Sequence, residues 1–403
     1  MTSTERKFTS VEICAGAGGQ AVGLHNALFK HLALIEVDKH ACATLRHNIE
    51  GNAEWGGCEV MEQDLTKLAP DELKKKLKPR LALQDEGNAE VSLDLLAGGV
   101  PCPPFSAAGR QLGKDDERDL FPTMLDLVDC LKPKAVMIEN VRGILEPAEK
   151  FHEYRETYIK RRLRESGYVI CGWELLEARD FGVPQLRPRA ILVAMLPDYA
   201  GHFVWPNPAD AKLVTVAEAL TPSMRKRFGK TPEGKAAFKK WRDMAKRGVA
   251  PTLVGGSKKH GGADLGPTRA KNAWLKLGVD GMGVANSSKK MTDPGRDLYG
   301  PRGPKLTVEQ AALIQGFPAK WKFTGLKTAA YRQVGNAFPP PVAEAVGRQI
   351  VRALEAGAKS PIPEDSYEKN TEGDMLFDIA DSSEFLRAQP SHRSRDLESA
   401  IVG

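Results

Sequence analysis

Cys102 stands between Pro101 and Pro103, directly after the apolar stretch VSLDLLAGG. Proline fixes φ and removes a backbone donor, so these neighbours exclude the cysteine from a helix interior or a central strand. The pattern predicts a thiol in a rigid loop at the carboxyl end of a strand, where an α/β protein can carry a nucleophile. A buried, inert thiol is the other interpretation, and the segment by itself leaves both open.

A glycine-rich turn follows the first predicted strand and opens a predicted helix. Glycines at such a turn let the backbone approach a nucleotide-like ligand at the helix N-terminus. Glu36 ends the next strand about 20 residues on, the usual spacing for a carboxylate that binds ribose hydroxyls. Asp64 ends a third candidate strand, where it can accept from an adenine amino group. Together these features predict an adenosine-containing cofactor.

The spacing of the glycines and the presence of the thiol indicate which cofactor. The turn reads G-x-G-G, whereas dinucleotide-binding turns usually read G-x-G-x-x-G. Simple hydride transfer also has no role for a thiol nucleophile, which disfavours a nucleotide-dependent oxidoreductase. The combination favours methyl transfer from S-adenosylmethionine.

Further polar residues follow at strand ends. Glu139 ends the predicted strand AVMIENV, so its carboxylate is expected at the same sheet edge as Cys102. The extended segment QLRPR carries Gln185, Arg187 and Arg189 at alternate positions, so their side chains share one face. Two arginines on one face suit a phosphate, a base carbonyl or a carboxylate. A surface acid and an exposed strand edge are the alternatives.

The elements that must position these residues alternate regularly. Short apolar runs alternate with helical patterns from Phe8 to about Pro197, which predicts an α/β fold with a parallel sheet of the βαβ kind. From Trp205 to about Lys305 this rhythm gives way to Gly, Pro and Lys, which predicts a second, loop-rich domain. Helical patterning resumes after Leu306, and a polar, mobile tail is expected from about Ser360.

Charge is unevenly distributed along the 403 residues. The chain has a net charge of +6, but residues 221–305 contain 20 Lys and Arg against 6 Asp and Glu. A basic segment on a mildly acidic body is typical of proteins that bind nucleic acid. The six cysteines are scattered without a C-x-x-C pair, so neither a disulfide framework nor a metal site is expected. The start has no signal-peptide pattern and no apolar run reaches membrane-spanning length.

Eight motifs, in order, resemble those of the DNA cytosine-carbon-5 methyltransferases. The resemblance runs from about Val11 to about Gln349. The motifs are AGAGG (15–19), EVD (36–38), DL (64–65), GGVPCPPFS (98–106), ENV (139–141), QLRPR (185–189), LTVEQAALIQGFP (306–318) and QVGNAFPPPVA (333–343). The resemblance implies a Rossmann-like S-adenosylmethionine-dependent methyltransferase sheet with a smaller, loop-rich target recognition domain.

The resemblance also implies a role for each catalytic candidate. The thiolate of Cys102 would add to carbon 6 of a cytosine flipped out of duplex DNA. Glu139 would contact ring nitrogen 3 and the exocyclic amine, and Arg189 would hold the carbonyl oxygen. Arg187 would support the thiol and the nearby backbone. Carbon 5 would then take the methyl group, and elimination would release the enzyme.

Two sets of binding residues follow. The expected cofactor-binding residues are Ala15, Gly16, Ala17, Gly18, Gly19, Glu36, Val37, Asp64, Leu65, Pro101, Asn336 and Ala337. The expected DNA-binding residues are Ser106, Arg110, Gln185, Ser257, Lys258, Lys259 and Arg269. Residues 107–120 resemble the family's mobile catalytic loop, with Gly109 and Gly113 as hinges and Arg110 and Arg118 near the DNA backbone. Residues 257–269 are the candidate base-reading loop, and an ordinary structural loop is the alternative.

The implied organisation is discontinuous. Residues 1–203 form the first part of the catalytic domain, 204–325 the target recognition domain, 326–358 a return segment that completes the catalytic domain, and 359–403 the tail. We expect a cytoplasmic bacterial monomer that meets the nucleoid through duplex DNA and belongs to a restriction-modification system with a separate endonuclease. The recognition sequence does not follow from the residues.

Cys14 marks one departure from the family pattern. The family usually has Asp-Leu-Phe before the glycines, where this chain has Glu12-Ile13-Cys14. The missing phenylalanine predicts a looser cofactor contact, with Cys14 as a small apolar filler. A tRNA cytosine methyltransferase on the same core is an alternative, but the insert lacks the Cys-Phe-Thr run that marks it. A non-enzymatic DNA-binding module is disfavoured by the intact Cys102 and Glu139.

Overall fold

The computed structural model describes residues 8–82, 92–101, 119–255, 263–287, 290–362, 367–369 and 375–377. Seven strands form one sheet in the order β3-β2-β1-β4-β5-β7-β6. The strands are β1 (Phe8–Ile13), β2 (Phe29–Glu36), β3 (Glu59–Glu62), β4 (Leu95–Gly99), β5 (Ala135–Val141), β6 (Val169–Glu177) and β7 (Pro188–Met195). The α/β class is confirmed.

The sheet is mixed, although the alternating pattern predicted a parallel one. β7 runs antiparallel to both of its neighbours, β5 and β6. Its first residues therefore meet the carboxyl end of β5, and Arg189 is paired with Val141 in the ladder. This reversal brings the QLRPR segment to the edge where Glu139 lies. β6 itself was not predicted as a strand.

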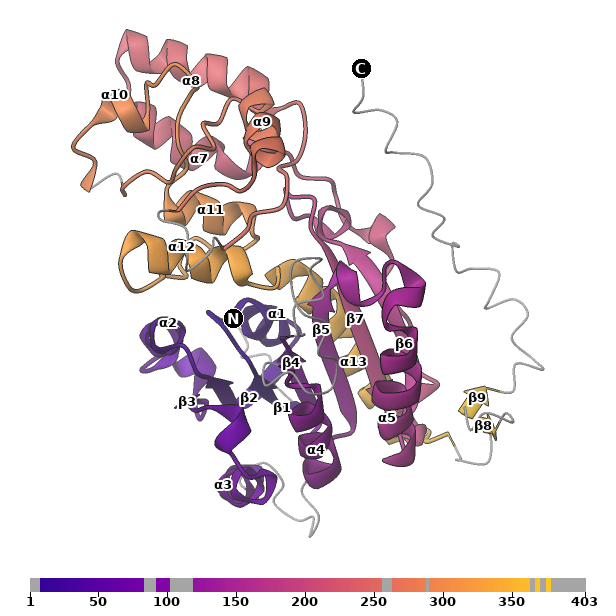
Figure 1. Cartoon of the computed structure of the whole chain (residues 1–403). Helices are drawn as coiled ribbons and strands as arrows, with labels where there is room; N and C mark the ends of the chain where they lie inside the picture. The colour runs from indigo at the N-terminus through magenta and orange to yellow at the C-terminus, as the bar shows by residue number, and fades with distance from the viewer. Residues whose placement is uncertain are drawn as a thin grey trace.

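Helices cover both faces of the sheet, because the strand side chains alternate between two apolar layers (Figure 1). On one side are α3 (Pro70–Ala82), α4 (Phe121–Leu131) and α5 (Arg161–Glu165), which continues a π-helical turn at Tyr154–Lys160. On the other side are α1 (Gly19–Asn26), α6 (Pro197–Ala200) and α13 (Pro340–Lys359). α2 (Lys39–Ile49) follows β2. Short 3₁₀ turns lie at Ala53–Trp55, Leu65–Lys67, Arg142–Ile144, Ala148–Phe151, Ala178–Phe181 and Pro208–Asp210.

The basic segment contains more helix than its composition suggested. Its helices are α7 (Val216–Phe228), α8 (Pro232–Ala245), α9 (Thr268–Lys276) and α10 (Pro294–Asp297), joined by long loops. α7 begins with a capping box in which Thr215 and Glu218 bond each other's backbone. α11 (Val308–Ile314) and α12 (Lys327–Asn336) lie between this segment and the sheet (Figure 1).

Part of the predicted tail is ordered. β8 (Tyr367–Lys369) and β9 (Met375–Phe377) form a two-stranded hairpin. Tyr367 is 4% exposed, and its hydroxyl donates to Pro197 O (2.6 Å) and accepts from Gly201 N–H (3.2 Å). A polar, unpatterned composition gave no sign of this one buried aromatic anchor. Residues from 378 onward lie outside the described part of the chain.

Candidate active site and cofactor pocket

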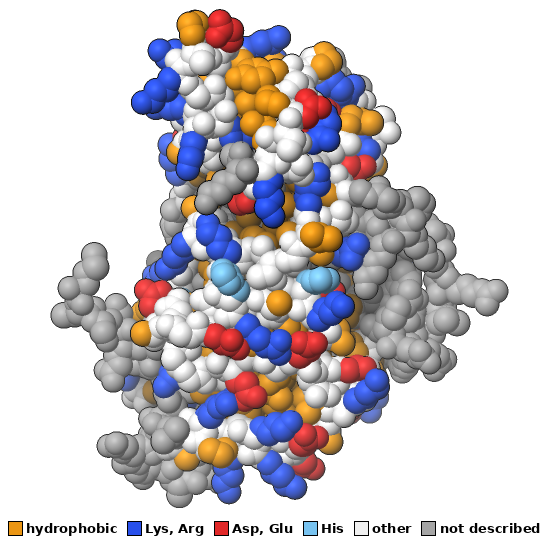
Figure 2. All heavy atoms as spheres, turned by 90° about the vertical axis from the view of Figure 1, so that its left-hand side faces the viewer, with side chains coloured by type: hydrophobic (Ala, Val, Ile, Leu, Met, Phe, Trp, Pro, Cys, Tyr) orange, Lys and Arg blue, Asp and Glu red, His pale blue; other side chains and the backbone are white. Residues whose placement is uncertain are grey.

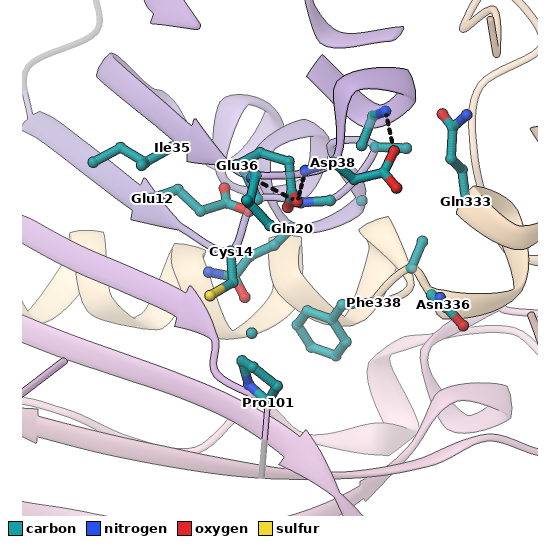
Figure 3. Close-up of a pocket in the computed structure, with 18 of the residues that line it drawn as sticks. Glu12, Cys14, Gln20, Ile35, Glu36, Asp38, Pro101, Gln333, Asn336 and Phe338 are labelled. Carbon is teal, nitrogen blue, oxygen red and sulfur yellow. Dashed lines mark hydrogen bonds between the residues drawn. The ribbon is translucent and has the colours of Figure 1, made fainter. Parts of the chain in front are cut away.

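A cavity of about 380 Å³ lies at the carboxyl ends of β1, β2, β4 and β5 (Figure 3). This is the edge of an α/β sheet where ligands usually bind. Of the twelve residues expected to bind the cofactor, all but Gly18 line it. They are Ala15, Gly16, Ala17, Gly19, Glu36, Val37, Asp64, Leu65, Pro101, Asn336 and Ala337.

The glycine turn is held by the carboxylate at the end of the next strand. Gly16 has φ of +53°, a conformation that suits glycine, and its N–H donates to Glu36 Oε2 (2.7 Å). Glu36 Oε1 accepts from the N–H groups of Val37 (2.9 Å) and Asp38 (2.8 Å). A carboxylate has about four lone-pair sites, so Glu36 retains acceptor capacity toward the cavity.

Gly18 and Gly19 serve packing. A Cβ on Gly18, whose φ is +87°, would lie 2.8 Å from both Leu45 and Trp321. A Cβ on Gly19 would lie 2.1 Å from the carbonyl oxygen of Phe338. The two glycines therefore allow the start of α1 to lie against segments that are 300 residues away in sequence.

Asp64 lies in a turn, two residues beyond the end of β3. Its carboxylate caps a 3₁₀ helix by accepting from the Thr66 N–H (3.1 Å) and hydroxyl (2.7 Å). These hydrogen bonds lower the pKa of Asp64, which therefore stays an anionic acceptor at the cavity wall.

Glu139 is paired with Arg189 at the other end of the cavity. Arg189 Nε lies 2.7 Å from Glu139 Oε1, and both side chains are nearly buried. Burial raises the pKa of Glu139, while the charges of Arg189 and Arg187 oppose the rise. A carboxyl group in this state can both accept and donate a proton. A Cβ on Gly99 would lie 3.1 Å from Glu139 Oε2, so glycine keeps this carboxyl group accessible.

Cys102 lies outside the described residues, as do Ser106, Arg110 and the predicted hinges Gly109 and Gly113. The residues that flank this segment are described. Pro101, which precedes the cysteine, and Leu120, just after the segment, both line the cavity together with Glu139. The described residues on both sides of this segment therefore lie at the cavity.

Comparison with known proteins decides the family. A model of the C-5 cytosine-specific DNA methylases matches residues 8–352. The chain belongs to the C-5 cytosine-specific DNA methylase family. The prediction of a DNA (cytosine-5-)-methyltransferase is confirmed at this level.

Two curated relatives belong to the type II methyltransferases. M.NaeI of Lentzea aerocolonigenes is 49% identical over 345 residues, which cover 85% of this chain and 75% of that protein. M.NgoMIV of Neisseria gonorrhoeae is 44% identical over 352 residues, which cover 87% of this chain and 99% of that protein.

Solved structures agree in fold. The methyltransferase EhMeth of Entamoeba histolytica superposes with a TM-score of 0.56 at 14% identity, covering 87% of this chain and 99% of that chain. The Dnmt2 methyltransferase of S. pombe gives a TM-score of 0.53 at 17% identity, covering 86% of this chain and 98% of that chain. In the described part of this methylase, no helix is long and apolar enough to cross a membrane.

Gln185, predicted to contact DNA, is fully buried. Its Nε2 donates to Gln315 Oε1 (2.7 Å), and its Oε1 accepts from the Leu253 N–H (2.6 Å). Because the side chain is fully buried and each amide atom already has a partner inside the protein, Gln185 does not reach the surface where DNA would bind, so that prediction is wrong. Its partners lie 68 and 130 residues away in sequence, which is why the motif alone suggested an exposed position.

Arg187 joins three parts of the chain. Its guanidinium is 1% exposed and donates to Leu253 O (2.6 Å), Gly335 O (2.8 Å) and Ala337 O (3.0 Å). Burial lowers its pKa. Arg187 thus ties the basic segment to the return segment that lines the cavity. The thiol that it was expected to support lies outside the described residues.

The candidate DNA-binding residues on the basic segment are described only in part. Ser257, Lys258 and Lys259 lie outside the described residues, whereas Arg269 is exposed in the first turn of α9. In the upper part of Figure 2, over this segment, blue Lys and Arg side chains are more frequent than red acidic ones and surround a hydrophobic patch, whereas acidic and basic side chains are mixed below it. The picture agrees with the charge excess counted in the sequence.

The cavity is also lined by residues that were not predicted as site residues. Glu12, Gln20, Gln333 and Phe338 line the cavity beside the expected set. Cys14 lines it too, and its φ of +51° is unusual for a residue with a side chain. Burial, with smaller contributions from Glu36 and Glu12, raises the pKa of Cys14 strongly, so the group stays a neutral thiol. Its predicted role as an apolar filler fits this state.

Proposed function

We propose that this methylase transfers a methyl group from S-adenosylmethionine to carbon 5 of a cytosine in a short, specific site of duplex DNA. The observation that carries the proposal is a shared cavity. Pro101, next to the candidate nucleophile, and the carboxyl group of Glu139 line the same cavity as the glycine turn and Glu36. One cavity of this kind suits a reaction in which the methyl donor and the base that accepts the methyl group must meet.

The residues of the cavity fit the proposed cofactor. Glu36 offers acceptor capacity for ribose hydroxyls, and Val37, whose side chain is 64% exposed, offers apolar surface beside it. Asp64 remains anionic and can accept from an amino group. S-adenosylmethionine, when bound, supplies an electrophilic methyl group next to the sulfonium. Gly16, whose added Cβ would have nothing within 4 Å, leaves room for a ligand to approach the backbone.

Glu139 and Arg189 would activate the ring of the target cytosine. As the Cys102 thiolate adds to carbon 6, electron density moves toward carbon 5 and ring nitrogen 3. A carboxyl group whose pKa is raised by burial can give a proton to nitrogen 3, and Arg189 can hold the carbonyl oxygen. Methyl transfer would leave S-adenosylhomocysteine, and the nitrogen 3 proton would return to Glu139. Transfer of the carbon 5 proton to water and cleavage of the Sγ–carbon 6 bond would then restore the thiolate.

The target base must leave the helix for this chemistry. Carbon 6 of a stacked cytosine is out of reach of a thiol at a sheet edge, so we propose base flipping, which costs a few kcal/mol. The predicted contacts of Ser106, Arg110 and Arg269, and of residues 257–259, would offset this cost through the DNA backbone and base edges. We also propose cytoplasmic action within a bacterial restriction-modification system.

Labelled methyl transfer tests the proposal. Tritiated methyl from S-adenosylmethionine should enter duplex DNA in preference to tRNA, and bisulfite sequencing should locate it at one short motif. Cys102→Ala should abolish transfer while S-adenosylhomocysteine still binds. Glu139→Gln should slow transfer by about 10²–10⁴-fold, as expected for loss of a general acid. Continued methylation by the Cys102→Ala variant would refute the covalent mechanism.

A further inference from the structure

Gln20 is a buried polar residue without a partner. It is the second residue of α1, is 3% exposed and lines the cavity. Within the described part of the chain, neither its Nε2 nor its Oε1 makes a hydrogen bond. Buried amides are nearly always bonded, because leaving one unpaired is costly. An unpaired amide at a cavity wall therefore points to a ligand that bonds it.

The start of α1 adds a second feature at the same place. Its N-cap is Gly18, which offers no side-chain cap, and no acidic residue lies in the first turn. The first hydrogen bond of the helix runs from the Val22 N–H to Gly18 O (2.9 Å). Among the described residues, the N–H groups of residues 19–21 have no such bond, and they and the positive end of the helix dipole can face a carboxylate.

Glu12 provides the opposite charge nearby. This carboxyl group is 1% exposed and lines the cavity, and its Oε2 has no hydrogen-bond partner among the described residues. Figure 3 shows Glu12, Cys14 and Gln20 grouped on one side of the cavity, across from Phe338 and Asn336. Burial, with a smaller contribution from Glu36, raises the pKa of Glu12. A cationic group beside Glu12 would favour its ionised form.

We propose that Gln20 binds the amino-acid end of S-adenosylmethionine, its amide nitrogen donating to the α-carboxylate and its amide oxygen accepting from the α-ammonium. This inference rests on the proposed function. A neutral amide has one donor and one acceptor side, and it lies between an uncapped helix N-terminus and a carboxyl group. That arrangement complements a zwitterion. A phosphate or other simple anion would be repelled by Glu12 and would leave the amide oxygen unpaired.

Two ligands that differ only at the amino-acid end test this role. S-adenosylhomocysteine has the α-amino and α-carboxyl groups, whereas 5′-methylthioadenosine shares its adenine, ribose and thioether but lacks them. Gln20→Leu should weaken the binding of S-adenosylhomocysteine by about 10–100-fold, as expected for loss of hydrogen bonds to charged groups. It should leave the affinity for 5′-methylthioadenosine within about twofold. Isothermal titration calorimetry measures both.

Stability without ligand separates binding from structural support. Removing an unpaired buried amide should raise the unfolding temperature of Gln20→Leu by a few degrees. If Gln20 had only a structural role, Gln20→Leu would instead lower the unfolding temperature and weaken the binding of both ligands alike. That result would overturn the proposal. Gln63→Leu is the matched control, because Gln63 also lines the cavity but donates to Asp64 O (3.2 Å). Gln63→Leu should change the affinity for the two ligands by the same factor.

The outcomes also separate this inference from the proposed function. If the parent protein binds neither ligand, the proposed cofactor is wrong. If the parent binds S-adenosylhomocysteine and Gln20→Leu binds it equally well, the cofactor stands and the role of Gln20 is wrong.

Discussion

Two of the buried polar clusters in the described part of the chain differ in how completely they are bonded. The junction cluster consists of Gln185, Arg187 and Gln315. Gln185 is hydrogen-bonded to Gln315, and Arg187 and Gln315 donate to backbone carbonyl groups of the basic and return segments. The pocket cluster consists of Glu12 and Gln20, with three side-chain atoms unpaired in the described part of the chain. In the junction cluster, Arg187 Nε alone lacks a partner.

This difference in hydrogen bonding suggests that the junction cluster stabilises the fold and that the pocket cluster binds a ligand. Bonded polar groups stabilise and fix the packing of segments that are distant in sequence. Unpaired polar groups destabilise the free protein and gain their partners when a ligand arrives. We therefore expect substitutions in the two clusters to change stability in opposite directions.

Arg187→Leu should have the largest effect. It removes the donor shared by the carbonyl oxygens of Leu253, Gly335 and Ala337, which then lose a partner in the interior. Ala337 O keeps the Gln315 Nε2 donor, so two buried carbonyl groups are left unpaired, and at about 1–3 kcal/mol each we expect a loss of about 2–6 kcal/mol. Urea denaturation measures it. Arg161→Leu, at an exposed pair with Glu165, should change stability by less than about 1 kcal/mol.

Gly255→Ala tests the packing beside the junction cluster. The new Cβ would lie 2.1 Å from Asn336 Oδ1 and 3.0 Å from Arg332 O, so a backbone or side chain must move. We expect a loss of about 1–3 kcal/mol by the same denaturation measurement. Gly143→Ala is the control, since nothing lies within 4 Å of its added Cβ. Equal stability of the two variants would show that the junction is loosely packed.

Glu12→Gln should have the smallest effect and the opposite sign. Burial raises the folded-state pKa of Glu12, so above pH 4.5 the folded protein holds a proton that the unfolded chain releases. The parent therefore loses stability relative to the glutamine variant as pH rises from about 4.5. Near neutral pH the variant should be more stable by on the order of 1 kcal/mol. Thermal unfolding without ligand, followed across pH, checks this. A difference that shrinks as pH rises would contradict the account.

Much of the site followed from the sequence, because its residues stand at strand ends. Glu36, Pro101 and Glu139 each come directly after an apolar run, and strands with the same direction end at one edge. The reversed direction of β7 did not follow, since an apolar run carries no sign of its orientation. The burial of Gln185 depends on Gln315 and Leu253, which no local pattern connects to it.

Gln20 did leave a signal in the sequence. It is a polar residue between a glycine turn and the apolar run AVGL, and every residue of α1 from Gly19 to His25 is buried. A polar side chain at the start of an otherwise buried helix needs a partner, and a nearby ligand is one source. That Gln20 and Glu12 line the same cavity depends on where β1 and α1 meet, which no local pattern in the sequence indicates.

Covalent trapping tests the central claim, methyl transfer through Cys102, most directly. Duplex DNA with 5-fluorocytosine at the methylated position should form an adduct that cannot eliminate, because the fluorine on carbon 5 does not leave as a proton does. With S-adenosylmethionine present, we predict a complex that survives denaturation, with the DNA attached to the peptide that contains Cys102. Cys102→Ala should give none. Trapping through another residue, or methylation without any adduct, would contradict the account.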